Sequence, residues 1–193
     1  MDKIRKGWMS ELQLQQFLAK EEKERYWALW ALMADCGLRI AEALKLRWRD
    51  VREGGGTGAI VKVEGKGDRI RYVEMTARVR NAMTRVYVEG TAGEKKLFPF
   101  TARAAQLRMK KTLSLANLKT YWSPHTLRHS FATRLIENGT PLHEVKSIMG
   151  HQSIKTTEKY LHVATGALGR ARGTLERAAG TVEAIDSQKD LKL

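Results

Sequence analysis

One stretch of this chain is apolar on every side, and it restricts the fold more than any other feature. From Tyr26 to Ala34 the sequence reads YWALWALMA, without a charged residue. A helix that lacks a polar face is typical of the buried core. Gly37 follows shortly afterwards, and glycine is the residue that most commonly ends a helix. We therefore predict a buried helix over residues 22–36.

Helical spacing and capping residues predict further helices on both sides of this segment. Ser10 is placed to cap a first helix, and Pro124 after Ser123 is a strong helix start. Ser153 is placed to cap a helix that carries Tyr160. The other predicted helices are a short one opened by Arg39 and the ranges 76–89, 101–118, 124–138 and 141–149.

Two β-like runs lie between the helical segments. The ranges 59–64 and 69–75 flank Gly65-Lys66-Gly67-Asp68, a sequence typical of a tight turn between paired strands. The predicted fold class is therefore mainly α with a small antiparallel β-sheet (α+β).

The chain is strongly basic, and the charge is unevenly distributed. Its 35 Lys and Arg residues against 21 Asp and Glu give a formal net charge of +14. Such an excess indicates a polyanionic partner, nucleic acid before an anionic membrane surface. Residues 101–120 contain no acid, so their basic side chains are predicted to face DNA. They are Arg103, Arg108, Lys110, Lys111 and Lys119. A merely solvated helix face is the alternative interpretation.

Other classes of protein are disfavoured by composition. A single cysteine excludes an intramolecular disulfide framework and a cysteine-based zinc site. No apolar run reaches the roughly 18 residues of a membrane span. No apolar segment follows the charges of the first ten residues, as a secretory signal requires. We expect no membrane contact and a cytoplasmic location, associated with the nucleoid when DNA is bound.

Familiar catalytic motifs are also missing. The chain has neither a phosphate-binding P-loop nor a GxSxG nucleophile elbow. His125 and His129 have a spacing that suits zinc, but Arg128 between them would place a fixed positive charge beside the metal. We therefore expect no metal and no cofactor.

The start of the helix at Pro124 is suited to an anion. His125 and Arg128 are three residues apart and share one face, at the positive pole of the helix dipole. A phosphate is the simplest ligand for this arrangement. From these two residues alone, a capping histidine and a salt-bridged arginine would be the better interpretation.

Three longer segments together resemble one family. The segment SPHTLRHSFATRLIENGTPLHEVKSIMGHQSIKTTEKYLHV is similar to the C-terminal motif block of the tyrosine recombinases, the phage-integrase family. CGLRIAEALKLRWRDV resembles the family's first arginine motif, and VEGKGDRIRYVEM resembles its lysine-bearing hairpin. The resemblance runs from about Ser10 to His162 and implies the catalytic-domain fold of that family.

The resemblance implies a set of site residues. Two would be catalytic arginines, one a hairpin lysine, two histidines and one the nucleophilic tyrosine; Glu42 would support the site. In that order the six catalytic residues are Arg39, Arg128, Lys66, His125, His151 and Tyr160. Each has a structural alternative. Arg39 could cap a helix or pair locally, and Lys66 could be an exposed turn residue. His151 could be a loop histidine packed beneath the next helix, and Tyr160 could be a core aromatic.

The implied activity is site-specific cleavage and rejoining of double-stranded DNA through a covalent 3′-phosphotyrosine, in integration, excision or inversion. Two arginine forks can hold the charge that develops on a phosphodiester without a metal ion. A relaxing activity like that of type IB topoisomerases and a catalytically silent DNA-binding regulator are the alternatives. Product analysis separates strand exchange from relaxation.

The resemblance also implies a domain organisation. Residues 1–165 would be the catalytic domain, without the family's usual N-terminal core-binding domain in this chain. Residues 166–193 would be a C-terminal tail whose apolar stripe from Leu168 to Ile185 docks on a neighbouring protomer. The expected partners are double-stranded DNA, further copies of the chain as a dimer or tetramer on DNA, and accessory DNA-bending proteins.

Overall fold

A computed structural model describes residues 7–53, 58–65, 69–87 and 93–150. Seven α-helices, one 3-10 turn and three strands lie in these ranges. Their bounds in chain order are α1 Glu11–Ala19, α2 Glu24–Cys36, α3 Ile40–Ala43, the turn Trp48–Asp50, β1 Val51–Glu53, β2 Ala59–Glu64, β3 Ile70–Glu74, α4 Ala77–Val86, α5 Ala102–Leu115, α6 Pro124–Glu137 and α7 Leu142–Met149.

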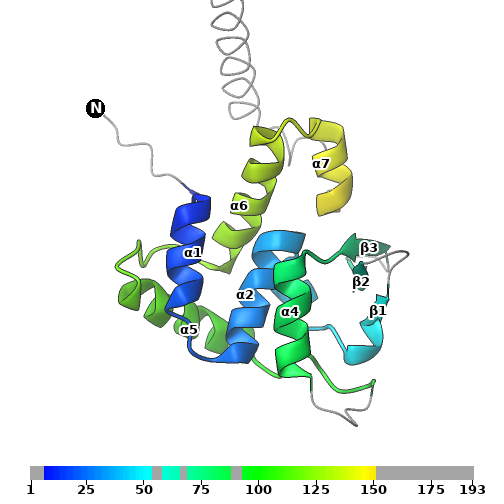
Figure 1. The fold of residues 1–193 in the computed structure, drawn as a ribbon, viewed down its shortest axis with the longest axis horizontal. Helices are drawn as coiled ribbons and strands as arrows, with labels where there is room; N and C mark the ends of the chain where they lie inside the picture. The colour runs from blue at the N-terminus through cyan, green and yellow to red at the C-terminus, as the bar shows by residue number, and fades with distance from the viewer. Residues whose placement is uncertain (1–6, 54–57, 66–68, 88–92, 151–193) are drawn as a thin grey trace, which may run out of the picture.

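Helix α2 forms the centre of the core, as its sequence predicts. Every residue from Ala28 to Cys36 is buried. Figure 1 shows α2 between α1 and α4, and it also packs on α6. Because this part of α2 is shielded from water, exposed polar groups are expected beyond its end at Gly37 or on neighbouring elements.

The sheet has one more strand than the sequence predicts. β1, β2 and β3 are antiparallel in that order, with Val61 of β2 opposite Val51 of β1 and Val73 of β3. The β2–β3 hairpin was predicted. β1 has only three residues, too few for an alternating pattern, and its pairing with β2 is a tertiary contact.

Helix boundaries follow the predicted caps closely, and the differences have local causes. Ser10 and Thr101 cap α1 and α5 through side-chain hydrogen bonds to the backbone. α2 begins two residues later than predicted because the Glu21 carboxylate accepts the Lys23 N–H in a turn. α5 ends three residues early because Asn117 adopts a left-handed backbone, with φ of 54°. The predicted helix after Ser153 lies outside the described residues.

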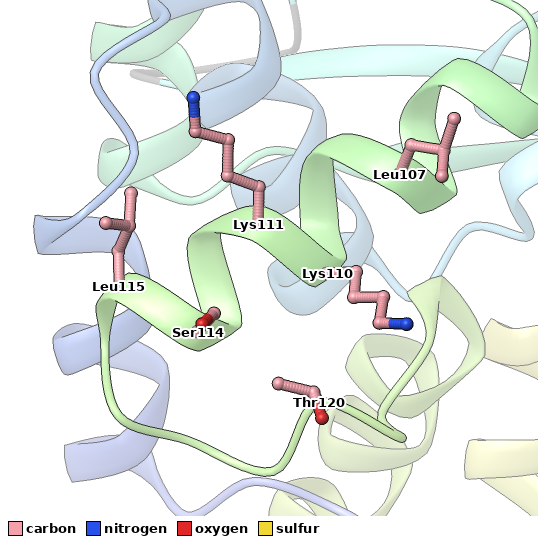
Figure 2. A pocket seen from close by; sticks show the side chains of 6 residues that line it. All are labelled: Leu107, Lys110, Lys111, Ser114, Leu115 and Thr120. Atoms are coloured by element: carbon pink, nitrogen blue, oxygen red, sulfur yellow. The ribbon is translucent and has the colours of Figure 1, made fainter.

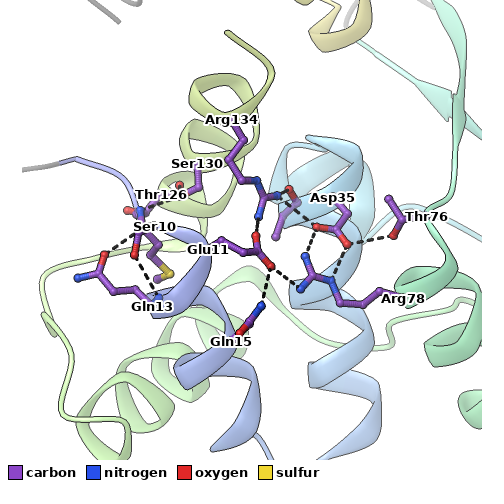
Figure 3. Close-up of polar contacts among 12 residues, drawn as sticks. Ser10, Glu11, Gln13, Gln15, Asp35, Thr76, Arg78, Thr126, Ser130 and Arg134 are labelled. Carbon is purple, nitrogen blue, oxygen red and sulfur yellow. Dashed lines mark hydrogen bonds and ion pairs between the residues drawn. The ribbon is translucent and has the colours of Figure 1, made fainter. Parts of the chain in front are cut away.

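An ion network joins four helices on one side of the core (Figure 3). Arg78 of α4 binds Asp35 of α2 through two nitrogens, at 2.6 and 2.7 Å. Arg134 of α6 also contacts Asp35, and both arginines reach Glu11 of α1. Because Asp35 is almost fully buried, these cations offset the cost of its desolvation.

The junction between α2 and α6 depends on a glycine. Gly37 ends α2 with φ of 65°, a left-handed conformation. A Cβ atom added there would lie 2.4 Å from Cδ1 of Phe131 on α6, closer than real Cβ contacts. Phe131 packs with Met149 of α7 in a second apolar cluster. The close approach at Gly37 therefore sets how α6 and α7 lie against the end of α2.

In the part of the chain that the structure describes, there is no helix both long and apolar enough to cross a membrane.

Replacing Gly37 by alanine should lower the free energy of unfolding by about 2–5 kcal/mol. About 1–2 kcal/mol comes from the left-handed backbone and about 1–3 kcal/mol from overpacking against Phe131. Gly139→Ala is the matched control, because φ is 89° there but a Cβ would meet nothing within 4 Å. That variant should lose only the backbone part, about 1–2 kcal/mol. Urea unfolding measures both, and equal losses would contradict the packing argument.

Candidate active site

Arg39 and Glu42 form the first part of the site, at the start of α3. Arg39 is the N-cap residue, and its backbone N–H donates to Oε2 of Glu42 at 2.8 Å. Its guanidinium donates to Oε1 of the same carboxylate, also at 2.8 Å. This is the local pairing considered from the sequence, but the Arg39 side chain remains 42% exposed. Glu42 is thereby held at the end of α2 with Arg39 open to solvent.

Arg71 of β3 binds both oxygens of the same Glu42 carboxylate. Its Nη1 donates to Oε1 of Glu42 at 3.1 Å and its Nη2 to Oε2 at 2.8 Å. The bidentate geometry is the strongest form of arginine–carboxylate pair. Arg71 was not among the residues predicted from the sequence. It lies three residues after Asp68 at the end of the predicted turn, and strand alternation alone does not show what its side chain meets.

Arg128 reaches the same region from α6. Its Nη1 lies 3.9 Å from Oε2 of Glu42 and donates to the carbonyl of Gly37, while its Nη2 donates to the carbonyl of Met149 at 2.7 Å. Only 2% of the residue is exposed. Arg128 thus joins α6 to the ends of α2 and α7, and it brings a second predicted catalytic arginine to the carboxylate that Arg39 binds.

The electrostatics of the cluster centre on Glu42, whose side chain is 7% exposed. Burial alone would raise the pKa of this carboxyl group. Hydrogen bonds and positive charge from Arg71 and Arg39 outweigh that effect and lower its pKa from 4.5 to about 2. Glu42 is therefore an anion at neutral pH and stays paired with the guanidinium groups.

His125 is an exposed residue in the otherwise buried first turn of α6, about one turn before Arg128. Its ring meets that of His129 edge-on, with 4.5 Å between centroids and an interplanar angle of 86°. Among the described residues, no group of three or more metal-ligating side chains comes together.

The remaining predicted site residues, Lys66, His151 and Tyr160, lie outside the described residues. Their nearest described neighbours in the chain lie close to Arg71. A Cβ on Gly65 would be 3.9 Å from its Nη1, and one on Gly150 would be 3.2 Å from the same atom.

The predicted DNA-facing residues divide into two groups. Arg103, Lys110, Lys111 and Lys119 are exposed. Figure 2 shows Lys110 and Lys111 leaving α5 in different directions around a hollow lined by Leu107, Leu115 and Thr120. Arg108 instead points inward, where its guanidinium binds the buried carboxylate of Glu21.

A family model described as "Phage integrase family" matches residues 7–166, most of the chain. The chain belongs to the phage integrase family. As predicted, its fold is that of a tyrosine recombinase catalytic domain, mainly helical with a small antiparallel sheet.

Two curated relatives of this phage integrase family member show the extent of the match. The tyrosine recombinase XerD of Corynebacterium glutamicum is 34% identical over 152 residues, which are 73% of this chain and 49% of XerD. The tyrosine recombinase XerC of Nitrobacter winogradskyi is 37% identical over 143 residues, 69% of this chain and 44% of XerC. The chain thus spans about half the length of the relatives it matches.

Solved structures share the fold of this phage integrase domain. The XerA recombinase superposes with a TM-score of 0.71 at 27% identity, over 88% of this chain and 65% of XerA. The catalytic domain of bacteriophage HP1 integrase has a TM-score of 0.65 at 20% identity, over 86% and 93% of the two chains. The XerH recombinase bound to its difH substrate before cleavage has a TM-score of 0.70 at 24% identity, over 81% and 50%.

The lowered pKa of Glu42 predicts a pH-dependent contribution to stability. A carboxyl with a lower pKa in the folded state stabilises the fold above its unfolded pKa, and this contribution is lost as pH falls through the folded value. The wild-type advantage over Glu42→Gln should therefore be largest near neutral pH and shrink between pH 4.5 and about 2. Urea unfolding of both proteins across this range measures it. A constant difference would show that the ion pairs do not stabilise the folded state.

Proposed function

We propose that this chain contains the catalytic domain, residues 1–165, of a site-specific DNA recombinase that cleaves and rejoins strands through Tyr160. Its substrate is double-stranded DNA, and its outcome is integration, excision or inversion of a DNA element. The observation that carries the proposal is the convergence of Arg39 and Arg128 on one buried carboxylate, that of Glu42. The names of its relatives, tyrosine recombinases XerC and XerD, support it.

The two arginines are suited to a phosphodiester in different ways. Arg39 is exposed enough to bind a phosphate oxygen while Glu42 orients it. Arg128 is held rigidly by two carbonyls, so its positive charge is fixed in place before DNA arrives. Only 2% of Arg128 is exposed.

The proposed reaction has two steps, cleavage of one strand and rejoining to another. The Tyr160 oxygen attacks phosphorus, the bond to the 5′ oxygen breaks, and the phosphate becomes a 3′-phosphotyrosine. The phenol proton leaves to a neighbouring acceptor, and Lys66 gives a proton to the departing 5′ oxygen. In the second step a 5′-hydroxyl from a second strand gives its proton back to Lys66 and attacks the adduct, so that a phosphodiester forms, the bond to Tyr160 breaks and the phenol regains its proton. His125 and His151 complete the proposed site, and no metal or cofactor is needed.

The exposed basic residues of α5 are proposed to bind the DNA backbone. Arg103 and Lys110 are seven residues apart, two helical turns, and share a face. Lys119 lies over the rings of Tyr121 and Trp122, just before α6 begins. Arg108 is less suited to DNA, because the Glu21 carboxylate already binds its guanidinium.

Assembly on DNA belongs to the same proposal. The stripe from Leu168 to Ile185 in the tail, residues 166–193, would dock on a neighbouring protomer to give dimers and tetramers. Accessory DNA-bending proteins and an association with the nucleoid remain part of the prediction.

The two alternatives are less well supported. A type IB topoisomerase-like enzyme would use the same chemistry without exchanging partners, but both curated relatives named here are recombinases. A catalytically silent DNA-binding regulator would not need Arg39 and Arg128 positioned around the buried carboxylate of Glu42.

The central prediction is a covalent adduct with DNA. The full chain, incubated in EDTA with nicked duplexes from its own genomic flanks, should form an adduct that resists SDS. Tyr160→Phe should abolish the adduct because it removes the attacking oxygen. Denaturing gels measure the product, and the sequence of the flanks supplies the sites to be tested.

Controls separate the alternatives to this prediction. An adduct that persists in Tyr160→Phe would exclude Tyr160 as the nucleophile, and a strict magnesium requirement would contradict the arginine-based mechanism. Strand exchange between two duplexes supports a recombinase, whereas relaxation alone supports the topoisomerase. The same reactions with a chain ending at Gly166 test the tail, because unchanged assembly on native gels would exclude its docking role.

A second prediction concerns the basic face of α5. The double variant Arg103→Ala/Lys110→Ala should bind DNA with a salt dependence whose slope, log affinity against log salt, is smaller by about 2. Lys20→Ala removes an exposed charge at the end of α1 and should leave the slope unchanged. Fluorescence anisotropy at several salt concentrations measures it. An unchanged slope in the double variant would place the DNA on another face.

A further inference from the structure

Arg71 occupies a central position among the segments that carry the predicted catalytic residues. Its guanidinium binds both oxygens of Glu42, and only 16% of its side chain is exposed. It lies on β3, whereas Glu42 belongs to α3. This ion pair is therefore a tertiary link between the hairpin and the segment that begins with Arg39.

The same side chain also packs against the turn that ends α7. A Cβ atom added to Gly150 would lie 3.2 to 3.4 Å from Nη1, Cδ and Cζ of Arg71. These are tight contacts, so the arginine lies directly over the glycine backbone. Gly150 precedes His151 in the chain, and Gly65, close to Nη1 of Arg71, precedes Lys66. Arg71 thus contacts or approaches three chain segments that meet at this point.

We propose that Arg71 is a positioning residue for the recombinase reaction, acting through Glu42; this inference rests on the proposed function. By holding both carboxylate oxygens, it fixes the acceptor that orients Arg39. It also pairs with the Glu42 carboxylate, which would otherwise attract Arg128 more closely. Nη1 of Arg128 lies 3.9 Å from Oε2 of Glu42. Arg128 can then remain bound to the carbonyls of Gly37 and Met149.

The geometry explains why this position carries arginine. Two parallel N–H donors match two carboxylate oxygens, which a lysine ammonium cannot reproduce. Direct binding of phosphate by Arg71 is less consistent with the structure, since both terminal nitrogens are engaged by Glu42. Its third nitrogen, Nε, is buried and has no hydrogen-bond acceptor among the described residues.

The first test compares Arg71→Ala with Arg52→Ala, which removes the same charge from an exposed position on β1 of the same sheet. With saturating enzyme and the nicked duplex, Arg71→Ala should cleave about 100-fold more slowly in a single turnover, as misplaced catalytic groups do. Its affinity for DNA should match that of Arg52→Ala. Arg71→Lys should recover little of the rate. An unchanged rate, or a loss of affinity alone, would overturn the proposal.

A double-mutant cycle tests whether Arg71 acts through Glu42. If it does, Arg71→Ala combined with Glu42→Gln should be no slower than Glu42→Gln alone. Losses that multiply would mean that Arg71 acts separately, for example by binding phosphate. Millimolar guanidinium ion should partly restore Arg71→Ala, whereas sodium at the same ionic strength should not. Melting curves show whether each variant folds, and Arg71→Lys replaces Arg71→Ala if the alanine variant does not.

Measuring the pKa of Glu42 needs no DNA cleavage, and it separates the positioning role of Arg71 from the proposed recombinase function. In NMR titrations of the Glu42 carboxyl carbon, removing Arg71 should raise the pKa of Glu42, because its main hydrogen-bond donor and a nearby positive charge are lost. An unchanged pKa would overturn the positioning role even if DNA is never cleaved. If wild type forms no adduct while the pKa rises, the proposed function fails and the ion pair is purely structural.

Discussion

The carboxylate of Glu42 is the point on which the polar part of this structure depends. An anion with so little exposure is stable only when cations and hydrogen bonds replace the water it has lost. Arg39 and Arg71 supply those bonds directly, and Arg128 adds positive charge at 3.9 Å. Because the three arginines come from α3, β3 and α6, one buried charge determines how a helix start, a hairpin and a distant helix are placed.

The apolar core makes this convergence geometrically possible. α2 is buried from Ala28 to Cys36, and the chain turns back toward the surface where the helix ends at Gly37. At that end the glycine admits Phe131, and its carbonyl accepts a hydrogen bond from Arg128. Gly37 therefore takes part both in the packing against α6 and in the hydrogen bonding of Arg128. A side chain at this position would displace the helix that carries Arg128.

The large positive charge of the chain is used in two ways. Arg78, Arg134 and Arg108 are drawn inward to buried or half-buried carboxylates, where they join helices. Arg103 and Lys110 remain exposed on α5. Guanidinium groups suit the first task because their donors match carboxylates in pairs. Net charge alone therefore overstates the positive charge that is exposed on the surface.

The sequence by itself determined the elements and the residue types of the site. Helix α2, the β2–β3 hairpin and the start of α6 were predictable because apolar spacing, glycines and capping residues act over a few neighbours. Arg39, Glu42 and Arg128 were predictable as candidates through family resemblance. Their placement around one carboxylate could not be predicted from the sequence. Strand β1, the inward orientation of the Arg108 side chain and the role of Arg71 could not be predicted either. Each of these depends on a contact between segments far apart in the chain, and only the packed tertiary structure decides which distant carboxylate a long arginine side chain reaches.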